Sequence, residues 1–357
     1  MSTPFSELHA GLDRLRRLVE REELPPPAII DAQLTLRCFM RCRYCRIWTF
    51  EGEELGFEPW RDLVTELRAW LGPFQFIISG GEPLLVPYLT ELLEHCRDLG
   101  VQTSLTTNGR LLDDPLLERL GRSGLGTLVL SLDALSPTHD QLRDSPGLAG
   151  HLRSVVEHFG TSSERIKLKI LSVISRANLG EIETLLDWAE GCEELTAVLF
   201  QALAQPFSTE FRQDWYLHND LWPDDLEAVD GLLDRVVRRQ AAGGKIENER
   251  FQLEFYKLYF RDPNQFVRHR CNLGRVLLKI SNQGQFSACF HMGVMGDLAR
   301  GSVREQWYSR QADEVRRRMR RCDLSCNLPV NCNFKENAAL VFGDRWREFD
   351  RDAVEQP

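Results

Sequence analysis

The sequence predicts an α/β fold whose parallel sheet curls into a partial, open-sided (β/α)6 barrel, followed by a small C-terminal α+β domain. Residues 28–205 alternate six short apolar runs, rich in β-branched residues, with amphipathic segments of helical periodicity. The helical segments at 59–72 and 87–100 end on glycine, as helices often do. Strands joined by helices pair in parallel with right-handed crossovers, and six units are two short of a closed eight-unit barrel.

Polar, small or thiol-bearing residues follow each predicted strand. SGGEP at 79–83 follows the second strand and TNG at 107–109 follows the third. The carboxyl ends of parallel strands meet at one rim, where the chemistry of such folds is found. The sequence therefore predicts a functional site at this rim, after strands at 29–36, 74–79, 101–106, 126–132, 166–174 and 195–201.

Composition and charge narrow the class of protein. The chain has 357 residues, 43% hydrophobic and 27% charged, which is ordinary for a globular protein. We find no apolar run of about 18 residues and no signal-peptide core, so we expect a cytoplasmic protein without a membrane partner. A net charge of -9 disfavours a nucleic-acid partner. The predicted division is an N-terminal helical extension, the barrel, a helical linker and the C-terminal domain, at 1–27, 28–205, 206–265 and 266–357.

Ten cysteines in a reducing compartment point to metal binding or catalysis where they cluster. Two stand alone, Cys96 and Cys192, and we expect them to be small apolar core residues. The other eight fall into two groups: Cys38, Cys42 and Cys45; and Cys271, Cys289, Cys322, Cys326 and Cys332.

The first group supplies only three ligands in a short loop after the first strand. A structural zinc site or a fully ligated iron–sulfur cluster takes four protein ligands. We find no histidine near enough in the sequence to complete a zinc site. Three thiolates on a four-iron cluster would leave one iron open, which suits catalysis. A zinc-stabilised α/β protein remains the alternative.

The C-x3-C-x2-C spacing, with Tyr44 before the last cysteine, resembles the signature of the radical S-adenosylmethionine (SAM) enzymes. The resemblance implies a partial TIM-like barrel with a [4Fe–4S] cluster on Cys38, Cys42 and Cys45. It implies that the open iron binds SAM, whose reductive cleavage gives a 5′-deoxyadenosyl radical that abstracts hydrogen from a substrate. Phe39 stands where asparagine is common in the family, which leaves the ligands untouched.

The resemblance continues along the barrel and implies the residues that contact SAM. The GGEP segment is similar to the family's segment beside the SAM amino group, and SLDA with the later HDQLR is similar to the segment that holds the ribose. The implied SAM-binding residues are Gly80, Gly81, Glu82, Pro83, Asn108, Ser131, Arg143 and Ser175. We could name no catalytic acid, base or hydrogen donor from the sequence.

The second cysteine group resembles the SPASM or twitch extension of these enzymes. The tripeptide NQG at 282–284 predicts a hairpin, with a cysteine beyond each outer end. The resemblance implies one auxiliary [4Fe–4S] cluster on Cys271, Cys289 and two of the remaining three cysteines. A second auxiliary cluster and a zinc ribbon are the alternatives. The arginine-rich run at 316–321 is expected to form a solvated helix face, with Val315 and Met319 inward.

The resemblance leaves the substrate open between two classes. One is a ribosomally made peptide, modified by an oxidative crosslink, epimerisation or a similar reaction. The other is a sugar or nucleoside, acted on by a dehydrogenase, epimerase or decarboxylase of natural-product biosynthesis. Either reaction implies an electron donor such as flavodoxin or ferredoxin. A non-catalytic iron–sulfur scaffold is a third class, which the intact triplet and GGEP disfavour.

Overall fold

A computed structural model describes residues 24–50, 52–162, 166–206, 209–266, 273–322 and residue 324. Within this part, one sheet has the strand order β6-β5-β4-β3-β2-β1-β7-β8-β9. The six parallel strands of the predicted barrel are confirmed, each within one residue of its predicted ends. They are β1 (Ile29–Thr35), β2 (Gln75–Gly80), β3 (Gln102–Thr107), β4 (Thr127–Ser131), β5 (Lys167–Ile174) and β6 (Leu195–Ala202).

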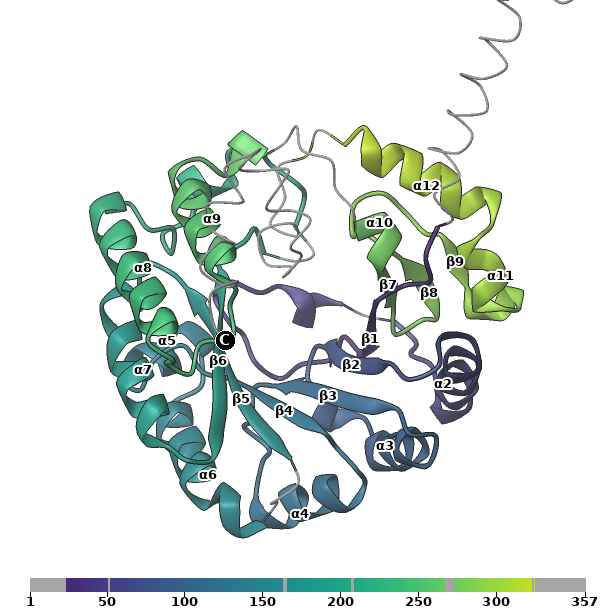
Figure 1. Ribbon diagram of the computed structural model, residues 1–357, viewed down its shortest axis with the longest axis horizontal. Helices are drawn as coiled ribbons and strands as arrows, with labels where there is room; N and C mark the ends of the chain where they lie inside the picture. Colours follow the sequence, from purple (N-terminus) through teal and green to yellow (C-terminus); the bar gives the residue numbers. More distant parts are fainter. Residues whose placement is uncertain are drawn as a thin grey trace, which may run out of the picture.

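The helices that follow these strands lie along the outer side of the curved sheet (Figure 1). The sheet side chains that face them, such as Ile30, Phe76 and Ile78, are fully buried. This outer layer is therefore the apolar core of the barrel. Its helices are α2 (Phe57–Leu71), α3 (Leu89–Asp98), α4 (Asp114–Arg122), α6 (Leu148–Ser162), α7 (Ile182–Gly191) and α8 (Leu226–Ala241).

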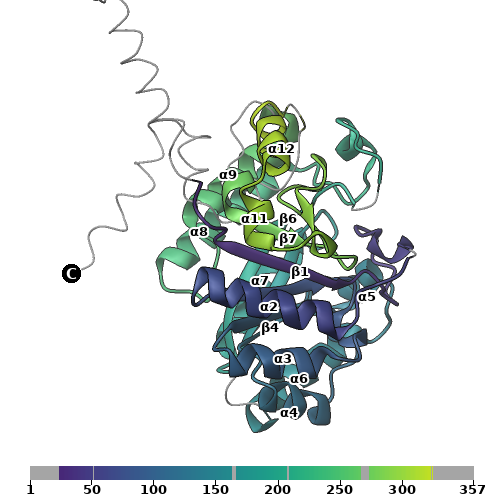
Figure 2. The ribbon, with the colours of Figure 1, turned by 90° about the vertical axis from the view of Figure 1, so that its right-hand side faces the viewer.

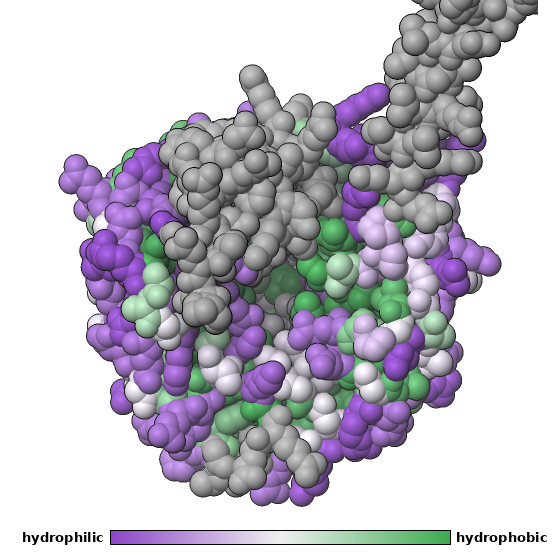
Figure 3. Space-filling view, viewed as in Figure 1, coloured by the Kyte–Doolittle hydropathy of each residue, from purple (hydrophilic) through white to green (hydrophobic). Residues whose placement is uncertain are grey.

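The inner face of the sheet is not packed in the same way. Along β1, β5 and β6, fully buried residues alternate with partly exposed ones, among them Gln33, Leu171 and Gln201. Because side chains alternate between the two faces of a strand, the partly exposed set shares the inner face. A space-filling view shows this side hollowed near its centre, with polar residues around the periphery (Figure 3). The barrel thus has an open interior.

The predicted hairpin is confirmed and extends the barrel sheet itself. Strand β7 (Leu277–Ile280) pairs in parallel with β1, and β8 (Gln285–Ser287) and β9 (Gly296–Asp297) follow in antiparallel pairing. Helices α10 (Leu273–Val276), α11 (Val303–Trp307) and α12 (Arg310–Arg320) lie beside it (Figures 1 and 2). The hairpin is therefore continuous with β1, while the predicted division into domains stays a prediction.

Helix α12 corrects one expectation. Val315 and Met319 face inward as expected, but Arg316 is not part of a solvated face, because only 4% of it is exposed. Its Nε donates to the Gly274 carbonyl at 2.7 Å, and its guanidinium lies 4.4 Å from the centre of the Trp307 ring. Arg316 therefore joins α12 to α10 and α11.

The two isolated cysteines have different surroundings. Cys96 on α3 is fully buried, as expected. Cys192 is only partly buried, but it packs against the hydrophobic core. It follows the last residue of α7 as the C-terminal cap, at the end of the apolar stripe. Of the predicted N-terminal helical extension, residues 1–27, the first 23 lie outside the described residues, and residues 24–27 have no helix. No described helix is long and apolar enough to cross a bilayer.

The outer edge of β6 is closed by a short backbone bridge between Val198 and Ile246 and, farther along the strand, by side chains. Asn248, which is fully buried, accepts a hydrogen bond from Phe200 N at 2.7 Å and donates to Phe200 O at 2.8 Å. Helix α9 (Arg250–Arg261) adds Tyr256, whose hydroxyl donates to the same carbonyl at 2.8 Å. These bonds satisfy backbone groups that would otherwise be open to unwanted pairing.

We predict that Asn248→Ala lowers the free energy of unfolding by about 1–3 kcal/mol, because it leaves a buried backbone N–H without a partner. Tyr256→Phe should cost about 1 kcal/mol, since Phe200 O keeps its bond from Asn248. Urea unfolding followed by circular dichroism measures both values. Equal losses in the two variants would contradict the assignment of the edge to Asn248.

Candidate active site

The cysteine triplet lies in a loop, residues 36–46, that has no helix or strand and leaves the C-terminal end of β1. All three thiols are partly buried, and burial raises their pKa values, that of Cys38 to about 11. The Cys45 N–H donates to the Cys42 carbonyl at 3.1 Å, which keeps these two cysteines in one turn of the loop. Because the thiolate is the ligand, a metal must displace their protons.

The spacing of the triplet bears on the zinc alternative. A tetrahedral zinc site, with Zn–S bonds of about 2.3 Å, needs sulfurs about 3.8 Å apart. In the described part of the chain, no three cysteine, histidine or acidic side chains converge to hold a single metal ion. Three thiolates would leave one iron of a four-iron cluster open, whereas a structural zinc site takes four protein ligands, so the donor set fits a cluster better than zinc.

The GGEP segment packs against the backbone of the cysteine loop. Gly81 N donates to Thr35 O and Glu82 N donates to Arg37 O, both at 2.8 Å. A Cβ atom on Gly80 would lie 2.2 Å from Thr35 O, and one on Gly81 would lie 2.2 Å from Arg37 O. Gly80 also has a φ of 120°, which favours glycine. Both glycines are therefore required by this contact.

Glu82 is fully buried and holds neighbouring loops in place. Its Oε1 accepts from Thr107 Oγ1 at 2.7 Å and from Leu84 N at 3.1 Å, and its Oε2 accepts from Asn108 N at 2.9 Å. Asn108 in turn directs its Nδ2 toward Cys38 Sγ at 4.0 Å. The Glu82 carboxylate thus positions Asn108 beside the first cysteine.

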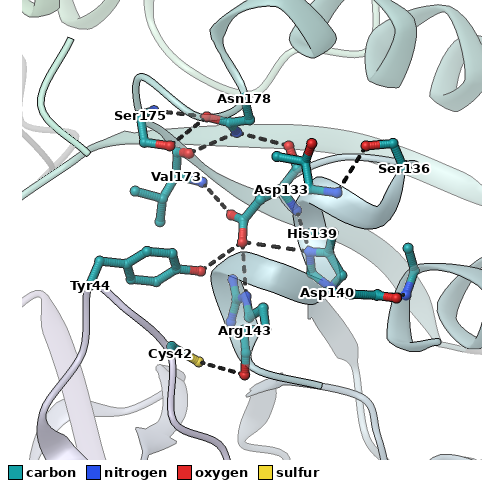
Figure 4. A network of polar contacts seen from close by, with 12 residues as sticks. Cys42, Tyr44, Asp133, Ser136, His139, Asp140, Arg143, Val173, Ser175 and Asn178 are labelled. Atoms are coloured by element: carbon teal, nitrogen blue, oxygen red, sulfur yellow. Dashed lines mark hydrogen bonds and ion pairs between the residues drawn. The ribbon is translucent and has the colours of Figure 1, made fainter. Parts of the chain in front are cut away.

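A second buried carboxylate, Asp133, joins the cysteine loop to β4 and β5 (Figure 4). Its Oδ2 accepts from Tyr44 OH at 2.6 Å and from Arg143 Nε at 2.9 Å, and its Oδ1 accepts from Val173 N at 2.9 Å. Burial raises the pKa of Asp133, but Arg143 and His139 outweigh it, so the pKa lies below the ordinary value. Asp133 is therefore ionised at neutral pH.

Arg143, at the end of α5 (Pro137–Arg143), lies between this carboxylate and the cysteine loop. Its guanidinium is 5.3 Å from the centre of the Tyr44 ring, and its carbonyl oxygen is 4.0 Å from Cys42 Sγ. Only 7% of Arg143 is exposed, and its Nε is bonded to Asp133. The structure therefore places this predicted SAM-binding residue beside the triplet, with most of its surface used inside the protein.

Two predicted serines lie at the same rim. Ser131 ends β4 and is 7% exposed. Ser175 is fully buried, and its hydroxyl donates to Asn178 Oδ1 at 2.8 Å. Asn178 Nδ2 donates to the Asp133 carbonyl at 2.8 Å, so Ser175 belongs to the network of Figure 4. With Pro83, which begins a 3-10 turn after β2, all the predicted SAM-binding residues lie near the strand ends.

Glu54 is a third carboxylate at the loop, and it lies in no sequence motif that predicts this role. Its Oε1 accepts from Thr35 Oγ1 at 2.6 Å and from Leu36 N at 2.9 Å, and its Oε2 accepts from Arg37 Nε at 2.9 Å. Asn282 Nδ2, in the hairpin turn, donates to Oε1 at 3.3 Å. The hydrogen bonds from Thr35 and Leu36 help to lower the pKa of Glu54, against the effect of burial.

Some of the other residues in these hydrogen-bond networks lie within sequence motifs, and others do not. Asp133 stands two residues after Ser131 in the SLDA segment, and Tyr44 precedes the last cysteine, so both were within the motifs. Asn178 and Glu54 lie in no motif and act through contacts between distant segments. Their roles required the structure.

Two of the five C-terminal cysteines lie in the described part, and each accepts a backbone N–H at sulfur. His291 N donates to Cys289 Sγ at 3.3 Å, and Leu324 N donates to Cys322 Sγ at 3.4 Å. The two thiols also interact electrostatically. N–H groups aimed at sulfur favour the thiolate form that a metal binds. The other three, Cys271, Cys326 and Cys332, fall outside the described residues.

We predict that Gly81→Ala displaces the cysteine loop, because its Cβ would meet Arg37 O at 2.2 Å. The expected result is a clear loss of the iron that the triplet binds on reconstitution, measured by iron analysis. Gly150→Ala is the matched control, because Gly150 is an exposed residue of α6 and an added Cβ would meet no atom within 4 Å. It should stabilise the protein by about 0.4–1 kcal/mol and keep full iron. Full iron in both variants would contradict the packing argument.

We predict that Asp133→Asn lowers the free energy of unfolding by about 3–5 kcal/mol, because it leaves Arg143 buried without its counter-charge. Asp220→Asn, which breaks the exposed pair with Arg43, should cost about 1 kcal/mol or less. Folding lowers the pKa of Asp133. The stability difference between Asp133→Asn and wild type is therefore full above the unfolded carboxyl pKa of about 3.9 and is lost as pH falls through the folded pKa. Urea unfolding at several pH values tests this.

Residues 33–189 match the family model described as the Radical SAM superfamily. The PqqA peptide cyclase of Rhizobium meliloti (strain 1021) is 33% identical over 170 residues, which are 46% of this chain and 44% of that protein. The Fe-coproporphyrin III synthase of Methanosarcina barkeri (strain Fusaro / DSM 804) is 27% identical over 221 residues, 60% of this chain and 53% of that protein. The chain therefore spans about half the length of the curated relatives it matches.

SuiB of Streptococcus suis has a similar fold. Its crystal structure bound to S-adenosylmethionine has a TM-score of 0.64 at 17% identity, covering 87% of this chain and 72% of SuiB. Its crystal structure bound to the precursor peptide SuiA also has a TM-score of 0.64, at 16% identity, covering 93% and 77%. At these identities the likeness shows the fold alone. Residues 33–189, which include the cysteine triplet and GGEP, are therefore the part of the chain that is similar to the radical SAM superfamily.

Proposed function

We propose that this chain is a radical SAM enzyme that modifies a ribosomally made peptide. The observation that carries the proposal is the triplet of Cys38, Cys42 and Cys45, held by three buried or half-buried carboxylates at the open rim of the barrel. Three thiolates leave one corner of a four-iron cluster open. In the superfamily such a cluster with SAM supplies a 5′-deoxyadenosyl radical, which abstracts hydrogen from a substrate.

The residues at the rim fit the cofactor. Cys38, Cys42 and Cys45 would hold the cluster, and the close packing of GGEP leaves its backbone at the edge of the same loop. Asn108 and the Asp133 network would fix the loop from the other side. The protein's part in the chemistry is to orient SAM and to keep the reacting atoms away from water.

A SPASM or twitch-type auxiliary [4Fe–4S] cluster is part of the proposal. Cys289 and Cys322 are near one another, and each receives a backbone N–H, as expected for ligating sulfurs. Cys271 and one further cysteine from 326 or 332 would complete the set of four. Residues 266–357 would then form an auxiliary domain that is joined to the barrel through β7.

A peptide substrate is supported by the relatives. The names of the cyclase from Rhizobium meliloti and of the SuiB complex both include a peptide. The inner face of the barrel also suits a polar chain, because partly exposed Gln33, Ser79, Thr106 and Gln201 lie on it. Such side chains can form hydrogen bonds with peptide groups. An oxidative crosslink or epimerisation is the reaction class we propose.

A small-molecule substrate is the second candidate. The relative from Methanosarcina barkeri has a name that denotes a porphyrin product, and it covers more of this chain than the cyclase does. The same polar side chains on the inner face are equally compatible with a sugar or nucleoside. The enzyme would then be a dehydrogenase, epimerase or decarboxylase of natural-product biosynthesis.

The cysteine loop also suits an acidic electron donor such as flavodoxin or ferredoxin. Residues 36–50 contain four arginines and no acidic residue, in a chain whose net charge is -9. Arg41 and Arg46 both lie over the ring of Trp48, at 4.3 and 6.0 Å from its centre. Arg37 and Arg43 are paired with Glu54 and Asp220, so Arg41 and Arg46 would be the cations that attract a partner of opposite charge.

The first test is anaerobic reconstitution, with iron and sulfide counted before SAM and dithionite are added. We expect about eight irons per chain, falling to about four in a Cys38→Ala, Cys42→Ala, Cys45→Ala variant, with 5′-deoxyadenosine formed only by the native protein. Cys192→Ala, which lies in neither cysteine group, should keep full iron and activity. Zinc in place of iron, or 5′-deoxyadenosine from the triple variant, would refute the assignment of the triplet.

A further inference from the structure

Lys279 on β7 is a buried cation. In the parallel register of β1 and β7, Lys279 lies opposite Asp31. The neighbours of Asp31 on β1, Ile30 and Ala32, are buried against the outer helices, so Asp31 and Lys279 both face the barrel interior. Only 7% of Lys279 is exposed. The described residues offer its ammonium no hydrogen-bond acceptor or ion-pair partner; its recorded contact is the Phe290 ring, 3.3 Å from Nζ to the ring centre. A buried, incompletely paired charge is costly to keep.

The charges around Lys279 come from three elements. Asp31 on β1 accepts a hydrogen bond from Ser79 Oγ on β2 at 2.5 Å, and it acts on Lys279 at longer range. Cys289, beyond β8, is the other group that acts on the ammonium. Burial lowers the pKa of Lys279 to about 8, while Asp31 and Cys289 oppose that shift. The side chain is therefore still mostly cationic at neutral pH.

The hairpin brings this cation to Cys289. Lys279 pairs with Ser287, the last residue of β8, in the antiparallel ladder, and Cys289 follows two residues later. Phe290, the ring under the ammonium, is the next residue after this cysteine. The contact with the Phe290 ring therefore holds the ammonium beside the segment that carries Cys289.

We propose that Lys279 is a positioning charge for the auxiliary cluster, which its ammonium makes easier to reduce. This inference rests on the auxiliary cluster of the proposed function. On reduction the cluster takes up one electron from an external reductant, its net charge becomes more negative by one, and no bond or proton is exchanged. A fixed cation nearby stabilises that added charge, and net charge and surroundings set cluster potentials. Asp31, of opposite charge on the same face, opposes the effect.

The test is a redox titration of the auxiliary cluster, followed by electron paramagnetic resonance. The full chain carries Cys38→Ala, Cys42→Ala and Cys45→Ala, so that a single cluster contributes to the signal. With Lys279→Met or Lys279→Gln we expect the ratio of reduced to oxidised cluster at a fixed potential to fall about tenfold, a shift of about 59 mV to lower potential. Lys279→Arg should keep the native value.

Two matched variants separate charge from structure. Asp31→Asn removes a negative charge from the same face and should shift the potential in the opposite direction. Lys169→Met removes a lysine that is already paired with Glu247 at 2.6 Å, across the barrel on β5, and should leave the potential unchanged. Iron analysis of each variant confirms that the cluster is loaded.

The outcomes are distinguishable. An unchanged potential in both neutral Lys279 variants with full iron would overturn the role of Lys279, and so would shifts of the same sign for Lys279→Met and Asp31→Asn. No iron at all in the triple-cysteine background would overturn the auxiliary cluster, and with it this inference, while the triplet's own assignment would stand on its separate iron and 5′-deoxyadenosine test.

Discussion

The structure of the rim depends on how an irregular loop is held. Residues 36–46 have no helix or strand, so their backbone cannot satisfy itself through a regular ladder. Carboxylates from three separate segments hold the loop instead. Glu54 binds its first residues, Glu82 fixes Asn108 beside Cys38, and Asp133 binds the hydroxyl of Tyr44. The loop itself contains arginines and no acidic residue, so each of the three carboxylates comes from a segment outside it.

These hydrogen bonds hold the loop in one arrangement, and burying the charged groups that make them costs solvation free energy. Asp133 and Arg143 are both buried, and moving two charges out of water can cost as much as their attraction returns. Such a pair adds geometric specificity, because its hydrogen bonds are made in one arrangement only. The bonds from Tyr44 and Val173 to the same carboxylate tie that arrangement to the loop and to β5. Preorganisation of this kind is what a cofactor site requires.

Patterns over a few neighbouring residues predict the features that depend on those residues alone. The six strands follow from alternating apolar runs, and the triplet and GGEP follow from spacing, so these parts of the fold and site were accessible. Contacts between distant segments were not. The pairing of β7 with β1, the edge closure by Asn248 and the burial of Arg316 join residues far apart in the chain. Each is a polar or backbone interaction that leaves no periodic signal.

Strand β1 connects the two proposed metal sites. Its C-terminal end leads into the cysteine loop, while its inward residue Asp31 stands beside Lys279 on the hairpin. Glu54 strengthens the connection, because it binds both the start of the loop and Asn282 in the hairpin turn. The relative placement of the triplet and Cys289 is therefore fixed by strand pairing and one shared carboxylate. An electron that passes between a substrate in the barrel and either site would cross a distance that the sheet itself determines.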